Sequence, residues 1–435
     1  SNMGTATVVT MLRHRLVLIT VLAGVIAVGA ASPAFASHTA KFGVQDDAWI
    51  LYGPGTLDQR LATLDKLGVK TVRITLRWDR IAAQKPADQR DPDDPNYVWG
   101  TTGDTLLALH QDGIATLVTI WGSPRWANGG RAPNYLPRAG LGNFAYAASK
   151  RFPWIHMWTI WNEPNLRTFS NPVSPSLYVK RLLNPAYANL HAASRANKVA
   201  GGVTSPRRTS SGISPLTFMA GMAKAHAHLD AYAQNPYPGS PRETPDYDPC
   251  THCETFTMAR LSEIRRDVTH YFGFKPLWLT EYGYQTNPPD RLSGVSPLKQ
   301  AAYLDQAALK VWQASGVTVL IQFLIKDEPG VGGWQSGLIS AKGTQKPAFR
   351  AFALPLVQLS RSGNRVTVWG QVRPGHGVRT YFLQRWNGKR WVTIGSRAKT
   401  YPSGTLIRKI SGYHGEKLRI TTPLFEGTSQ PVVLS

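Results

Sequence analysis

The chain has 435 residues, of which 42% are hydrophobic and 17% are charged. These values exclude an intrinsically disordered chain and leave room for one large domain and a smaller module. The formal net charge of +23 indicates either a soluble protein of a basic proteome or a surface that attracts polyanions. Zinc-finger spacing, an RNP aromatic signature and a G-x-x-x-x-G-K-[ST] loop are all missing from the sequence, so no nucleic acid or nucleotide is expected as a partner.

Residues 1–36 have the pattern of a targeting segment. The first two residues are interpreted as an expression-tag remnant. Arg13 and Arg15 precede an apolar run of roughly 15 residues, and the motif Ala-Phe-Ala follows shortly after it at residues 34–36. This run is shorter than the ~20 residues of a membrane span, so cleavage after Ala36 is favoured over a membrane anchor. We expect a secreted, extracellular protein without a stable membrane span after signal cleavage.

Residues 37–356 alternate between short apolar runs and longer amphipathic ones. The predicted strands cover residues 42–47, 69–78, 114–122, 155–163, 198–205, 229–238, 275–283 and 317–327. The predicted helices cover residues 56–68, 103–113, 143–152, 174–197, 214–228, 255–273, 296–316 and 344–353. Pro185 is expected to kink or split the fourth helix, and Ser214 to cap the fifth.

This alternation predicts a parallel sheet covered by helices, and its length suits a closed (β/α)8 TIM barrel as the catalytic domain. A doubly wound open sheet is the alternative. It is disfavoured because no glycine fingerprint follows the first strand.

Residues 357–435 have a different pattern of apolar and polar residues. Short segments with period-2 alternation are separated by Gly, Pro and Asn turns, among them Asn387-Gly388, which predicts a small C-terminal antiparallel β-sandwich. This segment holds 13 Lys and Arg against two acidic residues. The sequence leaves two roles open for this basic module, docking on anionic glycan or cell wall, and packing on the barrel as a structural element.

Two cysteines, Cys250 and Cys253, form a C-x-x-C motif in a loop. In an exported chain a local disulfide is favoured over a redox or metal site, because zinc would need two further ligands. We expect no metal and no cofactor.

Two glutamates lie at the ends of predicted barrel strands. Glu163 ends the fourth strand and Glu281 the seventh, and aromatic residues flank both. In such barrels the reactive groups lie at the carboxyl ends of the strands. Two carboxyl groups at one barrel mouth are what glycoside hydrolysis requires, one as the acid and one facing the anomeric carbon.

The region from about residue 42 to residue 352 resembles clan A glycoside hydrolases, nearest to families 5 and 39. The matching motifs are G-x-x-x-VRI-x-x-x-W at 68–78, TIWGSPRWA at 119–127, WNEPN at 161–165, NPYP at 235–238, WLTEYGY at 278–284, WQSGLIS at 334–340 and KPAF at 346–349. WNEP on strand four followed by TEYG on strand seven is the most specific part of the resemblance.

The resemblance implies a role for each matching residue. Glu163 would be the general acid/base, with its pKa raised by a neighbouring carboxylate and by partial burial. Glu281 would be the nucleophile, kept ionised by Arg73. Asn162 would bind the sugar 2-OH, and Tyr237 would donate its hydroxyl to Glu281.

Four tryptophans are candidates to floor the cleft: Trp121, Trp126, Trp161 and Trp334. The chain departs from the family pattern twice. Asn235 stands where His is frequent, and Phe323 or Leu324 stands where strand eight usually ends in Trp. Trp334 is a candidate to replace that tryptophan.

We therefore expect a retaining O-glycoside hydrolase that acts on a carbohydrate polymer or oligosaccharide, which the basic surface suggests is anionic. The expected separation of the carboxyl groups is ~5–5.5 Å. The alternative is a carbohydrate-binding barrel whose catalysis has lapsed. Arg77 competes with Arg73 for its role, Asp46 and Asp47 are expected either to touch sugar or to cap a helix, and Asp327 is expected to be a loop charge.

Overall fold

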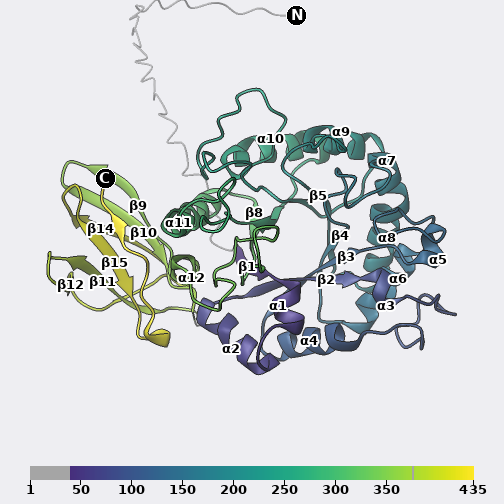
Figure 1. Ribbon diagram of the computed structural model, residues 1–435, viewed down its shortest axis with the longest axis horizontal. Coiled ribbons are helices and arrows are strands. Elements are labelled where there is room, and N and C mark those ends of the chain that lie inside the picture. Colours follow the sequence, from purple (N-terminus) through teal and green to yellow (C-terminus); the bar gives the residue numbers. More distant parts are fainter. Residues whose placement is uncertain (1–39, 375–376) are drawn as a thin grey trace, which may run out of the picture.

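The computed structural model describes residues 40–374 and 377–435. The predicted signal peptide at residues 1–36 lies outside these ranges. Figure 1 shows a ring of strands surrounded by helices, with a separate group of antiparallel strands against one side. Among the described residues, no helix combines the length and the apolar character that crossing a bilayer requires.

The ring is a closed barrel of parallel strands in the order β1 to β8. The strands are β1 (Lys41–Gln45), β2 (Thr71–Arg77), β3 (Ala115–Trp121), β4 (Met157–Ile160), β5 (Lys198–Thr204), β6 (Ala231–Gln234), β7 (Leu277–Tyr282) and β8 (Val317–Phe323). Closure comes from β1 pairing with β8, with Lys41 opposite Val319 and Gln45 opposite Phe323. The predicted TIM barrel is confirmed.

Helices connect the strands and cover the outside of the barrel. They are α1 (Asp47–Tyr52), α2 (Leu57–Leu67), α3 (Trp78–Ile81), α4 (Gly100–Gln111), α5 (Arg125–Asn128), α6 (Leu141–Arg151), α7 (Pro175–Tyr178), η1 (Val179–Leu183), α8 (Asn184–Ala193), α9 (Pro215–Lys224), η2 (Met258–Arg260), α10 (Leu261–Phe272), α11 (Pro297–Gln313) and α12 (Pro347–Ala353). Ser214 caps α9 by accepting from Thr217 N. The helical residues run without a gap from α7 through η1 into α8, and the distortion near Pro185 is the π-helical segment η1 that directly precedes the first turn of α8.

Several strands are shorter than the sequence predicts. β4 ends at Ile160 and β8 at Phe323, so Glu163 and Asp327 lie in the loops that follow. The inside of the barrel is filled by small and apolar side chains: Leu117, Ala200, Val203, Ala231, Ala233, Trp278, Val319 and Ile321. This filling closes the lower barrel and leaves the strand ends to form the mouth.

The C-terminal strands form two antiparallel sheets, which confirms the predicted β-sandwich. One has the order β14–β10–β9, and the other β12–β11–β15–β16 with β13 beside β11. Their bounds are β9 (Leu356–Ser362), β10 (Arg365–Gln371), β11 (Thr380–Trp386), β12 (Trp391–Thr393), β13 (Ala398–Lys399), β14 (Thr405–Ser411), β15 (Lys417–Thr421) and β16 (Val432–Val433), with the short helix η3 (Leu424–Glu426) between the last two.

Buried contacts join the sandwich to the barrel. Trp369 of β10 is fully buried and packs with its ring 5.8 Å from that of Trp312 of α11. The guanidinium of Arg373 lies over the ring of Phe42 of β1 at 4.0 Å and over that of Phe352 of α12 at 4.7 Å. Gly68 ends α2 with a φ of 68°, and a Cβ there would collide with the Arg373 backbone. The sandwich therefore packs on the barrel as a structural element.

Candidate active site

The turn at residues 161–165 after β4 is fixed to β5 and the residue that follows it by one backbone and one side-chain hydrogen bond. Trp161 and Glu163 both have left-handed backbone angles, with φ of 72° and 40°. Glu163 N donates to Val203 O at 2.9 Å, and the fully buried Asn165 accepts from Ser205 N at 2.9 Å. Non-glycine residues adopt such angles where surrounding contacts enforce them, often at functional sites. The turn therefore holds Glu163 in a defined position at the mouth.

Glu163 is buried beside neutral hydrogen-bonding groups. Asn235 Nδ2 donates to Glu163 Oε1 at 3.2 Å, and Thr280 Oγ1 donates to Asn235 Oδ1 at 2.7 Å, which orients the amide. Burial is the main cause that raises the pKa of Glu163, and the charge of Glu281 adds to it, so the pKa reaches about 8. A carboxyl group in this state keeps its proton at neutral pH and can donate it.

Glu281, near the end of β7, is buried beside a cation. Its carboxylate forms an ion pair with Arg73 of β2 and accepts from the hydroxyl of Tyr237 at 3.1 Å. Burial and the Glu281 charge raise the pKa of Tyr237 well above its usual value, so this phenol stays protonated and donates. Glu281 is thus held by two donors, one on β2 and one in the loop that follows β6.

Arg73 also binds three other side chains at the mouth. Its guanidinium donates to Thr119 Oγ1 at 2.7 Å, to Asn162 Oδ1 at 3.0 Å and to the side chain of Gln45. Arg77, four residues on, instead forms a two-point ion pair with Asp79 at 2.8 and 2.6 Å. Of the two arginines, Arg73 is therefore the one that contacts Glu281.

A cavity of about 620 Å³ opens beside Glu281 and Asn162. Its lining includes polar and aromatic side chains from the loops after the first strands: Gln45, Asp47, Tyr52, Thr75, Arg77, Arg80, Trp99, Thr101, Thr102, Trp121 and Phe169. The volume falls in the range of small-ligand sites. It offers aromatic surface and hydrogen-bonding groups next to Glu281, which suits a sugar, whereas Glu163 is not part of its lining.

The four predicted cleft tryptophans have different positions. Trp121 lines the cavity, and Arg77 lies 4.9 Å from its ring centre. The prediction that Trp161 floors the cleft is wrong, because its ring is fully buried and its N–H donates to Phe169 O at 2.7 Å. Instead Trp161 supports Trp121, with ring centres 5.9 Å apart.

Trp126 and Trp334 are partly exposed and occupy other places. Trp126 packs edge-on against Trp78 at 5.7 Å and donates to Ala82 O at 2.7 Å. It lies outside the lining of this cavity, so its assignment to the floor is not supported. Trp334 packs against both Tyr237 at 5.2 Å and Phe323 at 5.5 Å, which places its ring next to a partner of Glu281.

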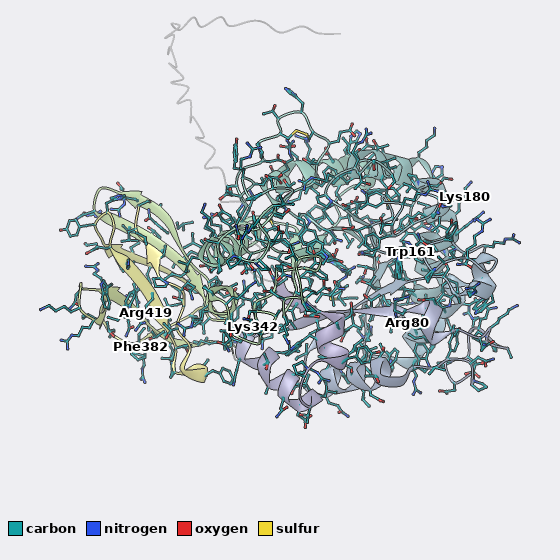
Figure 2. All side chains as sticks on the ribbon, in the orientation of Figure 1. Arg80, Trp161, Lys180, Lys342, Phe382 and Arg419 are labelled. Carbon is teal, nitrogen blue, oxygen red and sulfur yellow. A yellow bond between two sulfur atoms is a disulfide. The ribbon has the colours of Figure 1, made fainter. Side chains whose placement is uncertain are left out.

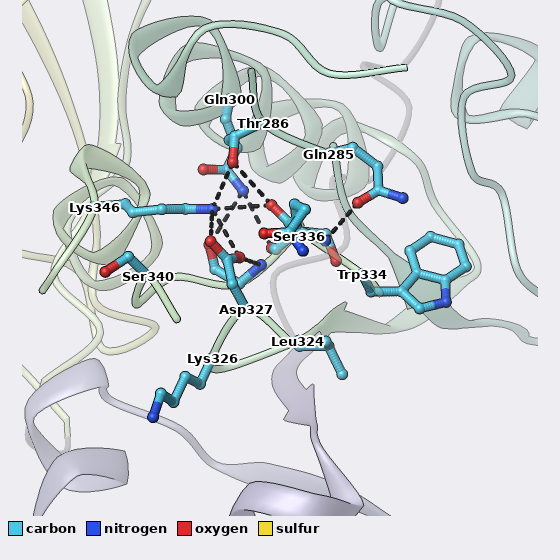
Figure 3. A network of polar contacts seen from close by, with 12 residues as sticks. Gln285, Thr286, Gln300, Leu324, Lys326, Asp327, Trp334, Ser336, Ser340 and Lys346 are labelled. Carbon is cyan, nitrogen blue, oxygen red and sulfur yellow. Dashed lines mark hydrogen bonds and ion pairs between the residues drawn. The ribbon is translucent and has the colours of Figure 1, made fainter. Parts of the chain in front are cut away.

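The loop that carries Trp334 is tied down by a buried ion pair (Figure 3). Lys346 Nζ contacts both carboxylate oxygens of Asp327 at 2.9 and 3.0 Å and donates to Gln335 O at 2.9 Å and to Thr286 Oγ1 at 3.0 Å. Asp327 also accepts from Gly337 N at 2.7 Å. Asp327 is therefore a buried anchor, and its expected role as a loop charge is wrong.

The two aspartates after β1 have separate roles. Asp46 caps α1 by accepting from Trp49 N at 2.9 Å, and burial raises its pKa to about 6. Asp47 accepts from Thr75 N at 2.8 Å and lines the cavity.

The sequence-based reasoning did not single out Gln45, Thr119 or Thr280 as site residues. Their one signal was a position near strand ends.

Two further features lie outside the mouth. Cys250 and Cys253 are joined by a disulfide, and Arg260 of η2 binds Asp248 of the same loop at 2.9 Å. Among the described residues, no group of three or more His, Cys, Asp and Glu side chains is arranged to hold a metal ion.

Solved glycoside hydrolases share this fold. A family 39 glycoside hydrolase from the gut symbiont Bacteroides cellulosilyticus WH2 matches with a TM-score of 0.58 at 15% identity, over 87% of this chain and 80% of that one. The GH39 enzyme from Xanthomonas axonopodis pv. citri matches with 0.56 at 13% identity, over 89% and 94%. A GH39 β-xylosidase from Caulobacter crescentus matches with 0.54 at 14% identity, over 87% and 97%.

These likenesses confirm the fold expected from the resemblance to family 39. At such identities they establish the fold, and the function has to be argued from the site. No protein-family model matches the chain, and no curated protein matches it in sequence.

Proposed function

We propose that the protein is a retaining O-glycoside hydrolase that cleaves oligosaccharides or polysaccharides by double displacement. The observation that carries the proposal is the contrast between two glutamates at one barrel mouth. Glu163 is bound by the neutral amide of Asn235, and Glu281 is bound by the guanidinium of Arg73. Retaining hydrolysis needs one carboxyl group that is protonated and one that is charged.

In the first step Glu281 attacks the anomeric carbon while Glu163 gives its proton to the leaving oxygen. The glycosidic bond breaks, the sugar becomes an ester of Glu281, and the leaving group departs as an alcohol. In the second step Glu163, now ionised, takes a proton from water. The hydroxide attacks the anomeric carbon, and Glu281 leaves as a carboxylate.

Asn162 and Tyr237 position the reacting groups in this scheme. Arg73 occupies Oδ1 of Asn162, so the amide offers its N–H groups to the sugar 2-OH, a contact that strengthens in the transition state. Tyr237 and Arg73 fix the Glu281 carboxylate in line for attack.

The polymeric and extracellular parts of the proposal have separate support. The cavity of about 620 Å³ is lined by Trp121, Trp99 and Thr101 as well as by Glu281, which gives room for more than the sugar that is cleaved. Secretion is inferred from the pattern of residues 1–36. Sequencing the N-terminus of protein recovered from culture medium tests it, and a mature chain that begins at Ser37 is expected.

The catalytic proposal is tested with the purified chain on a panel of aryl glycosides and polysaccharides. We expect the wild type to hydrolyse at least one substrate. The Glu281→Ala variant should lose this activity. The control variant Glu263→Ala, which removes a glutamate on the surface of α10, should keep it. NMR of the first product should show the substrate's anomeric configuration. If the chain hydrolyses nothing, or the Glu281→Ala variant works as fast as the wild type, a carbohydrate-binding barrel without catalysis replaces this proposal.

A further inference from the structure

One face of the sandwich carries aromatic and cationic side chains that the catalytic site does not use. Alternate residues of β11 and β15 point into the sandwich core: Tyr381, Leu383, Leu418 and Ile420. Because side chains alternate along a strand, Phe382, Gln384 and Trp386 of β11 lie on the opposite, outer face.

Two tryptophans form a pair at the end of this outer face. Trp386 of β11 lies directly opposite Trp391 of β12, with the ring centres 5.5 Å apart. Trp386 is 36% exposed. Phe382 lies four residues back on the same strand, about 13 Å away for an extended chain. The face therefore offers aromatic surface at both ends of β11.

Polar groups lie between these aromatic side chains. Gln384 is opposite Arg419 of β15, and Arg419 Nε donates to Gln384 Oε1 at 2.8 Å. The guanidinium of Arg419 also stacks over Trp391 at 4.3 Å. Figure 2 shows Phe382 and Arg419 on the same part of the sandwich. Arg419 is thus held in a fixed orientation with N–H groups left over for a ligand.

Most charges near this face are positive, although Glu416, directly before β15, lies 3.7 Å from Arg385 of β11. Lys389 and Arg390 are exposed in the turn that joins β11 to β12. Burial lowers the pKa of Arg419, and the neighbouring charge of Arg350 on α12 lowers it further. Residues 357–435 contain 13 Lys and Arg against two acidic residues. Cations that repel one another favour binding of an anion among them.

We propose that the face formed by Phe382, Gln384, Trp386, Trp391 and Arg419, called the tryptophan–arginine face, binds an anionic polysaccharide. Aromatic rings pack against the apolar faces of sugar rings, while Arg419 and Gln384 bind carboxylate or sulfate groups and hydroxyls. The choice of a glycan over a nucleic acid rests on the proposed glycosidase function. The surface itself is separate from the barrel mouth.

The experiment measures retention of the full-length chain in native gels that contain polygalacturonate, with dextran gels as the neutral comparison. The Glu281→Gln background prevents turnover, so the result does not depend on catalysis. We expect polygalacturonate to bind, and the affinity to fall by about tenfold or more in Trp386→Ala/Trp391→Ala. Arg419→Gln should weaken binding and reduce its salt dependence. Lys180→Gln also removes one positive charge, on the far side of the barrel in Figure 2. This control should change neither the affinity for polygalacturonate nor its salt dependence.

Circular dichroism and thermal melting establish that each variant is folded, and turnover of a small aryl glycoside should be unchanged in the tryptophan variant with intact Glu281. The proposal is overturned if polygalacturonate is not retained, or if the tryptophan variant binds it as the wild type does. It is also overturned if single-stranded DNA binds more tightly through the same residues, or if the wild type sediments as a dimer that this variant converts to monomer.

Discussion

Glu163 and Glu281 carry the same functional group in two different surroundings. Asn235 offers Glu163 one neutral donor, whereas Glu281 has a guanidinium and a phenol. A neutral donor stabilises a buried carboxylate less than a cation does. Within the proposed mechanism this difference in neighbours assigns the acid and the nucleophile, although the two residues are chemically alike.

The pH dependence of activity should report the proton on Glu163. Its pKa is raised to about 8, so kcat/KM should fall as the pH rises through that value. The Asn235 hydrogen bond lowers this pKa, and Asn235→Ala should therefore move the alkaline limb to higher pH. A pH–rate profile of both proteins measures the shift, and a limb that stays in place or moves down would contradict the assignment.

The same proton affects stability. The pKa of Glu163 is about 8 in the folded protein, against an ordinary value of 4.5. Between these values the folded state binds more protons than the unfolded state, so the free energy of unfolding falls as the pH rises. Glu163→Gln should raise the melting temperature by a few degrees at pH 8 and by less at pH 5. An equal change at both values would show that Glu163 does not titrate in this window.

Residue identities were easier to predict from sequence than side-chain directions. Glu163 and Glu281 were singled out because strand ends meet at a barrel mouth. Trp161 was misplaced because the left-handed turn at 161–163 rotates its ring into the core, and nothing in the letters WNEPN reveals a positive φ. Arg73 and Arg77 lie on the same face of β2, so the sequence alone does not tell which of them contacts Glu281. Only their partners in the folded structure distinguish their roles.

At the scale of elements, the loop between β8 and α12 is held by contacts within the protein. Asp327 and Lys346 are both buried, with 6% and 9% of their surface exposed. This ion pair holds the base of the loop that carries Trp334, and Trp334 packs against Tyr237. The loop beside the candidate site is thus held by an ion pair that does not touch the cavity described above.

Removing one member of this pair should be costly. Lys346→Met leaves the Asp327 carboxylate buried without its cation, and a loss of about 3–5 kcal/mol in the free energy of unfolding is expected. Asp327→Leu/Lys346→Met should recover most of that loss. Denaturant unfolding measures both variants. A surface pair such as Arg151 and Asp93 serves as the control, for which Arg151→Met should cost less than about 1 kcal/mol.

The order of helices and strands could be predicted because apolar periodicity and cap residues are local signals. Ser214 caps its helix as expected, and Pro185 directly follows a π-helical segment in a helix that continues past it. The ends of β4 and β8 could not be predicted, because the apolar pattern of the sequence continues past the last hydrogen bond of the barrel. The Asp327–Lys346 pair also escaped prediction, because 19 residues separate the two and no periodicity relates them.

At the scale of the whole molecule, the sandwich and the barrel share a buried contact. Trp369 and Arg373 from the sandwich meet Trp312, Phe42 and Phe352 from the barrel. Such contacts couple the unfolding of the two parts. The structural role left open by the sequence is thus supported, and docking through the outer face of the other sheet stays compatible with it.

The coupling can be tested at Trp369. Trp369→Ala removes a fully buried indole from this contact and should cost about 3–5 kcal/mol. If the two parts are coupled, unfolding followed by tryptophan fluorescence and by far-UV circular dichroism should give one shared, lowered midpoint. Trp386→Ala, on the exposed face, should change the midpoint little. Two separate transitions in the wild type would show that the parts unfold independently.

The pairing of β1 with β8 also bears on how the chain is made. Lys41–Gln45 is the first of the barrel strands to leave the ribosome, yet its hydrogen-bonding partner Val317–Phe323 is synthesised more than half a chain later. Arg373, which covers Phe42, follows later still. The nascent protein therefore keeps an open sheet edge for most of its synthesis, and a chain that stalls before residue 317 has no strand with which to seal it.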